Sequence, residues 1–144
     1  MSGGEHAEDL ARIQEALERA RTAFQRFTPG EIETRHKQGD DPVTEADTTV
    51  DTLLRELLPR NGDGWLSEET RDDLIRLEKR RVWVVDPLDG TREFVTGIPE
   101  WCVSIGLVVD GEPVAGGICN PVTGETIVGA RGAGVTLNGR PAGV

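Results

Sequence analysis

The 144-residue sequence contains 26 acidic and 16 basic residues, a formal net charge of −10, and 36% of its residues are hydrophobic. This charge excludes a protein that binds nucleic acid polymers through a basic surface, and an anionic substrate would need local cations. No apolar run approaches the length of a membrane span, and the polar residues 1–6 do not resemble a secretory signal. We therefore expect a single cytoplasmic domain over residues 1–144, without membrane contact.

The first predicted element is an amphipathic helix from Ala7 to about Phe27, because hydrophobic residues recur there at steps of three and four. A Thr-Pro-Gly sequence at 28–30 ends it. The polar segment 31–41 fits a loop or an edge strand.

A second helix is predicted to open in segment 41–47 and to end at Pro59. Thr44 and Asp47 fit the capping pattern in which a threonine is followed three residues later by an acidic residue. This pattern leaves a purely structural role open for Asp47, which would then bind only backbone amides of the first turn.

Two predicted strands end in acidic residues. Residues 64–67 read as a short strand that leads into Glu68, and residues 81–85 read as an apolar strand that leads into Asp86. The charged segment 71–80 between them is predicted to be a short helix or a surface loop. Because the ends of adjacent strands can converge, we expect Glu68, Asp86 and Asp89 to share one site.

The motif at 86–91, DPLDGT, supplies two carboxylates within four residues, followed by a glycine and a threonine. Pro87 favours an extended Asp86, Gly90 permits a tight turn, and Thr91 is a good helix N-cap. Carboxylates followed by exposed amides suit a hard divalent cation together with an anion. The alternative is an ordinary turn after a strand, since Asp, Pro and Gly are all turn residues.

Downstream, residues 92–96 are predicted to form one helical turn, and strands at 101–109 and 112–120 form a hairpin around Asp110-Gly111. Counted outward from that two-residue turn, Cys102 falls opposite Cys119, and we expect both thiols to be reduced. Shorter strands follow at 125–130 and near 135–137, and residues 138–141 are predicted to be a turn.

Three separated motifs occur in a fixed order: PVTEAD at 42–47, LSEE at 66–69 and WVVDPLDGT at 83–91. Together with residues 132–139, they resemble the inositol monophosphatase superfamily of magnesium-dependent, lithium-sensitive phosphatases. The resemblance covers nearly the whole chain. It implies an α+β fold in which a pair of helices is layered on a mainly antiparallel sheet, the N-terminal half of the αβαβα sandwich of that superfamily.

Within the superfamily, residues 66–69 and 86–94 look most like the 3′(2′),5′-bisphosphate nucleotidase branch, which hydrolyses adenosine 3′,5′-bisphosphate to AMP and phosphate. Residues 98–101, IPEW, are reminiscent of histidinol-phosphate phosphatases. Hydrolysis of inositol 1-phosphate is a further alternative. In each case the expected partner is a small phosphorylated substrate.

The resemblance also assigns metal ligands. Glu68, Asp86 and the backbone carbonyl of Leu88 match the ligands of a first Mg²⁺, and Asp86 would bridge to a second ion that Asp89 also binds. All these donors are oxygens, as Mg²⁺ requires. Two or three ions are expected in total, with Li⁺ as an inhibitor.

The resemblance assigns the remaining site residues as well. Thr91, hydrogen-bonded to Asp47, would orient the attacking water beside the metal bound by Glu68. The amides of Gly90 and Thr91 would hold the phosphate, and Lys37 would lie near the phosphate or a third metal. Attack would be direct and in line, without a phosphoenzyme.

Members of this superfamily are about twice as long as this chain, and their second half supplies a C-terminal α/β domain with a further metal-binding aspartate. With three carboxylates in place of four, we expect the second metal to bind weakly and the 144-residue chain to have low or no activity. An uncovered apolar sheet face would favour a homodimer. The alternative is a non-catalytic metal-binding fragment.

Overall fold

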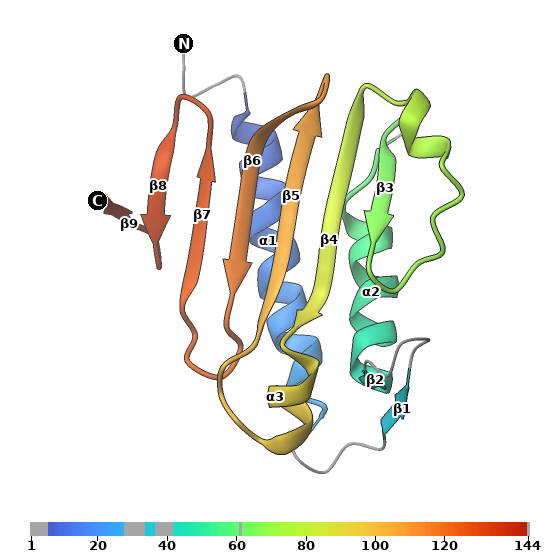
Figure 1. Cartoon of the computed structure of the whole chain (residues 1–144). Coiled ribbons are helices and arrows are strands. Elements are labelled where there is room, and N and C mark those ends of the chain that lie inside the picture. The colour runs from blue at the N-terminus through green and yellow to red at the C-terminus, as the bar shows by residue number, and fades with distance from the viewer. Residues whose placement is uncertain (1–5, 28–33, 37–41, 61, 144) are drawn as a thin grey trace.

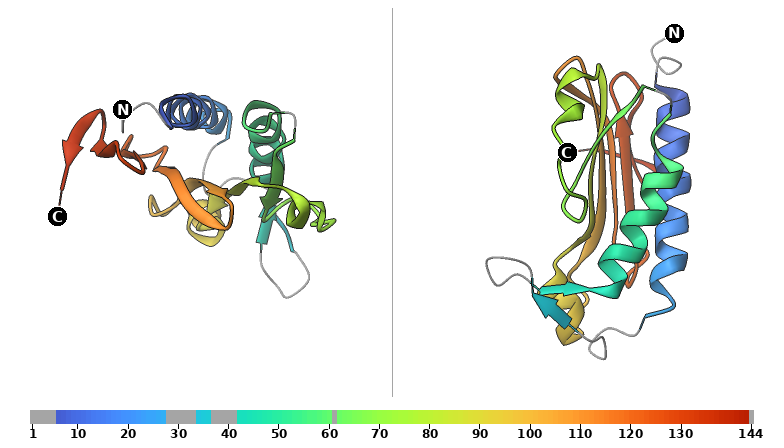
Figure 2. Two further views of the ribbon diagram at one scale, coloured as in Figure 1. Left: turned by 90° about the horizontal axis from the view of Figure 1, so that it is seen from above. Right: turned by 90° about the vertical axis from the view of Figure 1, so that its right-hand side faces the viewer.

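The computed structural model describes residues 6–27, 34–36, 42–60 and 62–143. In this part of the chain, two long helices, α1 (Ala7–Phe24) and α2 (Glu45–Leu57), cover one face of a seven-stranded sheet. Figure 1 looks onto the sheet with the helices behind it, and Figure 2 shows the two layers from above and from the side. The predicted α+β fold with a helix pair on a sheet is confirmed.

The large sheet has the strand order β3-β4-β5-β6-β7-β8-β9. Strands β3 and β4 run parallel, and the other neighbouring pairs run antiparallel. A separate hairpin, β1-β2, lies beside the start of α2. The remaining elements are β1 (Thr34–His36), β2 (Pro42–Thr44), β3 (Gly64–Ser67), the 3₁₀ helix η1 (Ile75–Glu78), β4 (Arg81–Asp89), α3 (Thr91–Thr96), β5 (Cys102–Val109), β6 (Glu112–Cys119), β7 (Thr126–Ala130), β8 (Gly134–Leu137) and β9 (Arg140–Ala142).

The core lies between the two helices and the sheet, and it follows the predicted periodicity of the helices. Ile13 and Leu17 from α1 are buried against β6, where a Cβ atom on Gly117 would lie 2.9 Å from a methyl carbon of each. That distance is shorter than a real Cβ contact, so α1 packs directly on the backbone of β6. Val50 and Leu54 of α2 are fully buried.

The structure corrects two boundaries of the predicted elements and decides between two alternatives for a third segment. Strand β4 does not end at Val85 but continues through the acidic motif to Asp89. The end of the chain is a hairpin, because Asn138-Gly139 forms a two-residue turn and Arg140 pairs with Leu137. The predicted turn over 138–141 was therefore too long. Segment 71–80 contains the short helix η1, which was one of the two alternatives.

The predicted pairing of the cysteines was wrong by one residue. The Asp110-Gly111 turn is present as expected, but the β5-β6 register shifts between Leu107 and Val108, and Cys119 pairs with Val103. The extra residue is a bulge that follows Pro113, a residue that cannot donate a ladder hydrogen bond. Both thiols are free, as expected.

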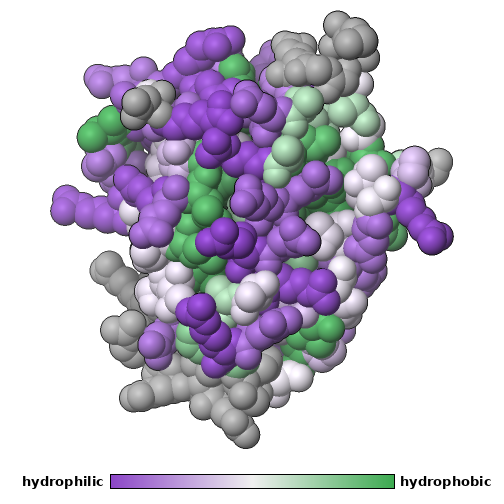
Figure 3. Space-filling model, turned by 180° about the vertical axis from the view of Figure 1, so that it is seen from behind, coloured by the Kyte–Doolittle hydropathy of each residue, from purple (hydrophilic) through white to green (hydrophobic). Residues whose placement is uncertain are grey.

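The two faces of the molecule differ in polarity. Seen from behind, the helix-covered face is mostly hydrophilic, with hydrophobic side chains confined to a strip and small patches (Figure 3). The helix-free face of the sheet exposes hydrophobic side chains from neighbouring strands, including Ile118, Ile127 and Val135. None of the described helices combines the length and apolar character that crossing a membrane requires.

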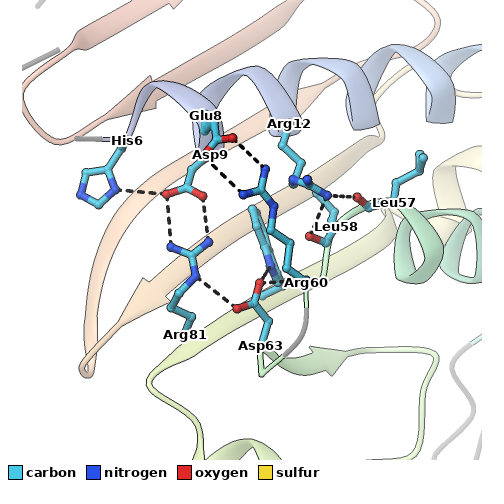
Figure 4. A network of polar contacts seen from close by, with 10 residues as sticks. His6, Glu8, Asp9, Arg12, Leu57, Leu58, Arg60, Asp63 and Arg81 are labelled. Carbon is cyan, nitrogen blue, oxygen red and sulfur yellow. Dashed lines mark hydrogen bonds and ion pairs between the residues drawn. The ribbon is translucent and has the colours of Figure 1, made fainter. Parts of the chain in front are cut away.

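A polar network ties the start of α1 to the start of β4 (Figure 4). The Asp9 carboxylate accepts two hydrogen bonds from the Arg81 guanidinium, at 2.8 and 3.3 Å, and its Oδ2 lies 3.2 Å from His6 Nδ1. Arg81 also donates to Asp63, which in turn accepts from the indole of Trp83 at 3.0 Å. Burial alone would raise the pKa of Asp9, but the bonds from Arg81 and His6 lower it below its ordinary value.

Because Asp9 is buried and shared between two elements, we predict that Asp9→Asn lowers the free energy of unfolding by about 1.5–3 kcal/mol. Glu8→Gln is the matched control, since Glu8 is the adjacent residue and its side chain is 80% exposed in its contact with Arg60. That control should change stability by less than about 0.5 kcal/mol. Urea unfolding of both variants measures the difference, and equal effects would contradict the assigned role of the network.

The same contact predicts a pH dependence. Folding lowers the pKa of Asp9, so the unfolded chain takes up a proton at a pH where the folded chain remains ionised. The stabilisation is complete above about pH 4 and is lost as the pH falls through the lower folded-state pKa. The stability difference between wild type and Asp9→Asn should therefore be constant from about pH 6 to about pH 4 and shrink from there to about pH 2. A difference that stays constant across this range would show that the Asp9 charge contributes nothing.

Candidate metal and phosphate site

Parallel pairing of β3 and β4 brings two predicted ligands, Glu68 and Asp86, to the same level near the carboxyl ends of these strands. Ser67 pairs with Val85 in the parallel register, so Glu68, the first residue after β3, lies at the level of Asp86 within β4. The Glu68 amide donates to the carbonyl of Val85 at 3.3 Å, which extends the ladder by one bond. The backbones of Glu68 and Asp86 are therefore neighbours, and a site shared by Glu68, Asp86 and Asp89 stays a prediction.

The acidic motif continues β4 in an irregular form. Asp86 pairs with Ser104 and Asp89 with Cys102, with a register shift between them. The amide of Leu88 donates to Asp86 Oδ1 at 3.2 Å, which closes a local turn around buried Pro87. Asp89 emerges exposed at the end of this turn.

Asp47 is fully buried and serves two purposes at once. Its Oδ1 accepts from the amide and the hydroxyl of Thr44, and its own amide donates to Thr44 Oγ1, which completes the predicted capping box of α2. Its Oδ2 lies 3.2 Å from Thr91 Oγ1, a hydroxyl that also lies 3.1 Å from the carbonyl of Leu88. The capping role and the contact with Thr91 are therefore not alternatives, because each carboxylate oxygen serves one of them.

Gly90 is required at the turn between β4 and α3. Its φ is +96°, a left-handed conformation that side chains disfavour. A Cβ atom here would lie 2.9 Å from the carbonyl oxygen of Glu100 and 3.0 Å from Cβ of Trp101. The first intrahelical bond of α3 is donated by Phe94 to the carbonyl of Gly90, so the amides of residues 91–93 precede it.

Three aromatic rings pack together next to this turn. Phe24, Phe94 and Trp101 meet edge to face, with ring centroids 4.8 to 5.9 Å apart. They come from the end of α1, from α3 and from the residue before β5. The position of the turn is therefore set by the hydrophobic core and not by the polar groups alone.

The carboxylates of Asp86 and Asp89 lie close enough to influence a neighbouring thiol. Burial raises the pKa of the Cys102 thiol, and the negative charges of Asp89 and Asp86 raise it further, with a smaller effect from Cys119. The motif thus produces a local negative potential on the side of β5 as well.

The residues at this edge suit a hard divalent cation by chemistry. Glu68, Asp86 and Asp89 offer carboxylate oxygens, and Leu88 offers a backbone carbonyl, which are the donors that Mg²⁺ and Ca²⁺ prefer. Within the described ranges, no three acidic, thiol or imidazole side chains gather into a group that could hold an ion. The backbone therefore places the donors on adjacent segments, and their side chains are not drawn together around one point.

Three residues beside Glu68 were not predicted from the sequence: Asp51, Ser67 and Thr70. The buried carboxylate of Asp51 accepts hydrogen bonds from Ser67 Oγ and from Thr70 Oγ1, the latter at 2.6 Å. Asp51 follows Asp47 by one helical turn on the same face of α2, a spacing that was visible in the sequence. Lys37, assigned to the phosphate by resemblance, lies outside the residues that the structure describes.

Comparison with known proteins gives one consistent result. The model of the inositol monophosphatase family matches residues 5–144. The chain is 39% identical over 141 residues to the inositol-1-monophosphatase of Mycobacterium bovis, covering 91% of this chain and 49% of that protein. It is 37% identical over 136 residues to the histidinol-phosphatase of Chlorobaculum parvum, covering 92% and 52%.

Solved structures agree with this result. The extragenic suppressor protein SuhB from Bartonella henselae superposes with a TM-score of 0.84 at 31% identity, covering 95% of this chain and 54% of that one. The chain thus spans about half the length of the relatives that it matches.

The bond between Thr91 and Asp47 predicts a measurable contribution to stability. Thr91→Val keeps the shape of the side chain but removes the hydroxyl, and it should lower the free energy of unfolding by about 1 kcal/mol. Thr96→Val is the control on the same short helix, because the exposed hydroxyl of Thr96 bonds only to carbonyls within α3. Its effect should stay within about 0.5 kcal/mol in urea unfolding. If the two variants lose the same stability, the bond to Asp47 contributes nothing.

Proposed function

The chain belongs to the inositol monophosphatase family, and from this premise we propose that it supplies the metal and phosphate groups of a Mg²⁺-dependent phosphatase acting on small phosphate monoesters. The observation that carries the proposal is the parallel pairing of β3 with β4, which puts Glu68 beside Asp86 at one sheet edge. The hydrogen bond between Thr91 and Asp47 at the same edge supports it.

Glu68, Asp86 and the carbonyl of Leu88 are the proposed ligands of a first Mg²⁺, and Asp86 and Asp89 those of a second. When bound, the ions would neutralise charge on the phosphate and lower the pKa of a bound water. The proposal includes two or three ions and inhibition by Li⁺. The donor set is all oxygen, which favours Mg²⁺ over softer transition metals.

Thr91 is the proposed partner of the attacking water. Its hydroxyl lies 3.2 Å from Asp47 Oδ2, and a hydroxyl that donates to a carboxylate keeps its lone pairs for a water proton. Asp47 Oδ2 and the Leu88 carbonyl, 3.1 Å away, are both acceptors for the Thr91 proton, and either bond leaves the lone pairs of the Thr91 oxygen available to a water proton. Water would attack phosphorus in line, and its new P–O bond forms as the bond to the alcohol oxygen breaks.

Backbone amides are the proposed phosphate contacts of this chain. The amides of Gly90 and Thr91 come ahead of the first intrahelical bond of α3, which Phe94 donates. Gly90 permits the turn at this point, because a Cβ atom would lie 2.9 Å from the carbonyl oxygen of Glu100. Lys37 remains a proposed contact to the phosphate or to a third ion, on resemblance alone.

The identity of the substrate is proposed separately from the type of reaction. Residues 66–69 and 86–94 favour adenosine 3′,5′-bisphosphate, so we assign a 3′(2′),5′-bisphosphate nucleotidase activity first. The names of the relatives favour inositol 1-phosphate and histidinol phosphate as the alternatives. A homodimer through the exposed sheet face and a non-catalytic role as a metal-binding fragment also remain predictions, and mass measurement in solution tests the homodimer.

A substrate panel separates these alternatives. Phosphate release from adenosine 3′,5′-bisphosphate, inositol 1-phosphate and histidinol phosphate is measured with and without Mg²⁺, and with added Li⁺. The highest kcat/KM should belong to the bisphosphate nucleotide, with low turnover throughout for the 144-residue chain. Preference for either other ester refutes the nucleotidase assignment, and Mg²⁺-independent turnover refutes the proposed chemistry.

Removing a proposed ligand should weaken metal binding, which can be measured even if turnover is too slow to follow. We expect Asp86→Asn and Glu68→Gln each to weaken Mg²⁺ or Mn²⁺ binding at least about tenfold in calorimetry, because each removes a charged oxygen ligand. Asp110→Asn is the control: Asp110 is an acidic residue in the β5-β6 turn, where it pairs with Arg80 at the far end of β4. Unchanged affinity in the two ligand variants means that the ions bind elsewhere.

A further inference from the structure

Helix α2 presents three polar side chains on one face at steps of four residues, and each reaches a different part of the candidate site. Asp47 contacts Thr91, Asp51 contacts Ser67 and Thr70, and the Arg55 guanidinium lies 5.4 Å from the ring centre of Trp65. Figure 1 shows why this is feasible, since α2 lies directly behind β3 and β4. The role of Asp47 has been described above, whereas Asp51 has no part in the proposed chemistry.

Asp51 is a buried carboxylate that is satisfied by hydroxyl groups. Its side chain is 7% exposed, and within the described part of the chain the structure gives it no ion pair with a basic residue. Its Oδ1 accepts from Ser67 Oγ, and its Oδ2 accepts from Thr70 Oγ1. A buried charge without a cation is costly, so its hydrogen bonds have to be well formed for the fold to tolerate it.

The two hydroxyl groups flank the acidic pair Glu68-Glu69. Ser67 Oγ also accepts from the amide of Glu69 at 3.2 Å, and the amide of Thr70 donates to the carbonyl of Ser67 at 3.4 Å. The amide of Glu68 itself is bound to β4. The backbone on both sides of Glu68 is therefore fixed, and Asp51 accepts the hydrogen bonds of both flanking hydroxyls.

Both hydrogen bonds at Asp51 are donated by the hydroxyls, so the side chain at position 51 has to accept at both of its polar atoms. Each hydroxyl donates its one proton to Asp51 and accepts from another group: Ser67 accepts from the Glu69 amide, and Thr70 accepts from the indole of Trp65 at 3.1 Å. An amide at position 51 would present a donor to one of these hydroxyls. That hydroxyl would then accept from the amide and lose the acceptor for its own proton, and the corner around Glu68 would lose a constraint.

We propose that Asp51 is a positioning residue that holds the Glu68-Glu69 corner against α2, so that Glu68 stays beside Asp86 when a divalent cation binds. The functional part rests on the proposed function, because it requires Glu68 to be a metal ligand. The structural part stands on the hydrogen bonds alone. Groups that orient metal ligands typically change metal affinity by about 10–100-fold when removed.

The test uses Asp51→Asn together with two variants of its partner. Thr70→Val removes one hydroxyl, and Thr70→Ser keeps it. Asp9→Asn is the matched control, because it removes a buried, hydrogen-bonded carboxylate near the start of β4, at the opposite end of that strand. The measurements are Mn²⁺ affinity by calorimetry, the free energy of unfolding, and hydrogen exchange at the amides of Glu68 and Glu69.

We expect Asp51→Asn to weaken Mn²⁺ binding at least about tenfold and to accelerate exchange at both amides. Thr70→Val should change both in the same direction, and Thr70→Ser should restore wild-type values. Asp9→Asn should lower stability while leaving Mn²⁺ affinity and these two amides unchanged. If Asp51→Asn loses stability but keeps wild-type affinity and exchange, Asp51 is only part of the scaffold and the proposal is overturned.

Failure of the proposed function and failure of this proposal give different results. If the wild-type chain binds no Mn²⁺ or Mg²⁺, the metal-dependent function fails. The structural part is then decided by exchange alone: faster exchange in Asp51→Asn and Thr70→Val, but not in Thr70→Ser, supports a positioned corner, and unchanged exchange overturns it.

Discussion

Two buried carboxylates on one face of α2 provide the constraint on which the candidate site depends. Asp47 and Asp51 lie one helical turn apart, and each accepts hydrogen bonds from hydroxyls on a different segment of the site. Burying such groups is unfavourable unless they are fully hydrogen-bonded, so the fold with the lowest free energy is one in which both segments meet α2. The helix therefore sets the distance between the Glu68 corner and the turn at Thr91.

The opposite ends of the sheet have different roles. At the start of β4, the Asp9–Arg81–Asp63 network joins α1 to the sheet through charge-assisted bonds whose partners are all provided. At the site, burial raises the pKa of the Cys102 thiol, and the negative charges of Asp89 and Asp86 raise it further.

Sequence patterns were sufficient for the helix pair, the capping box and the two-residue hairpin turn, because each depends on local spacing. They failed where the structure is determined by a β-bulge or by a contact between residues that are far apart in the sequence. The bulge after Pro113 moved Cys119 opposite Val103, and nothing in the pattern indicated that Arg81 would reach Asp9 or that Asp51 would accept from Ser67. The substrate and the number of bound ions could not be predicted in this way, because they depend on residues outside these local motifs.

The proposed binding of divalent cations where β3 ends beside β4 can be tested on the chain itself. In a titration of the ¹⁵N-labelled chain with substoichiometric Mn²⁺, the paramagnetic ion broadens only the amide signals of residues near it. We expect the signals of Glu68, Glu69 and residues 86–91 to broaden first, while those of Asp110 and Gly111, in the turn between β5 and β6, persist. Broadening that begins elsewhere, or is uniform across the chain, would contradict the proposed binding.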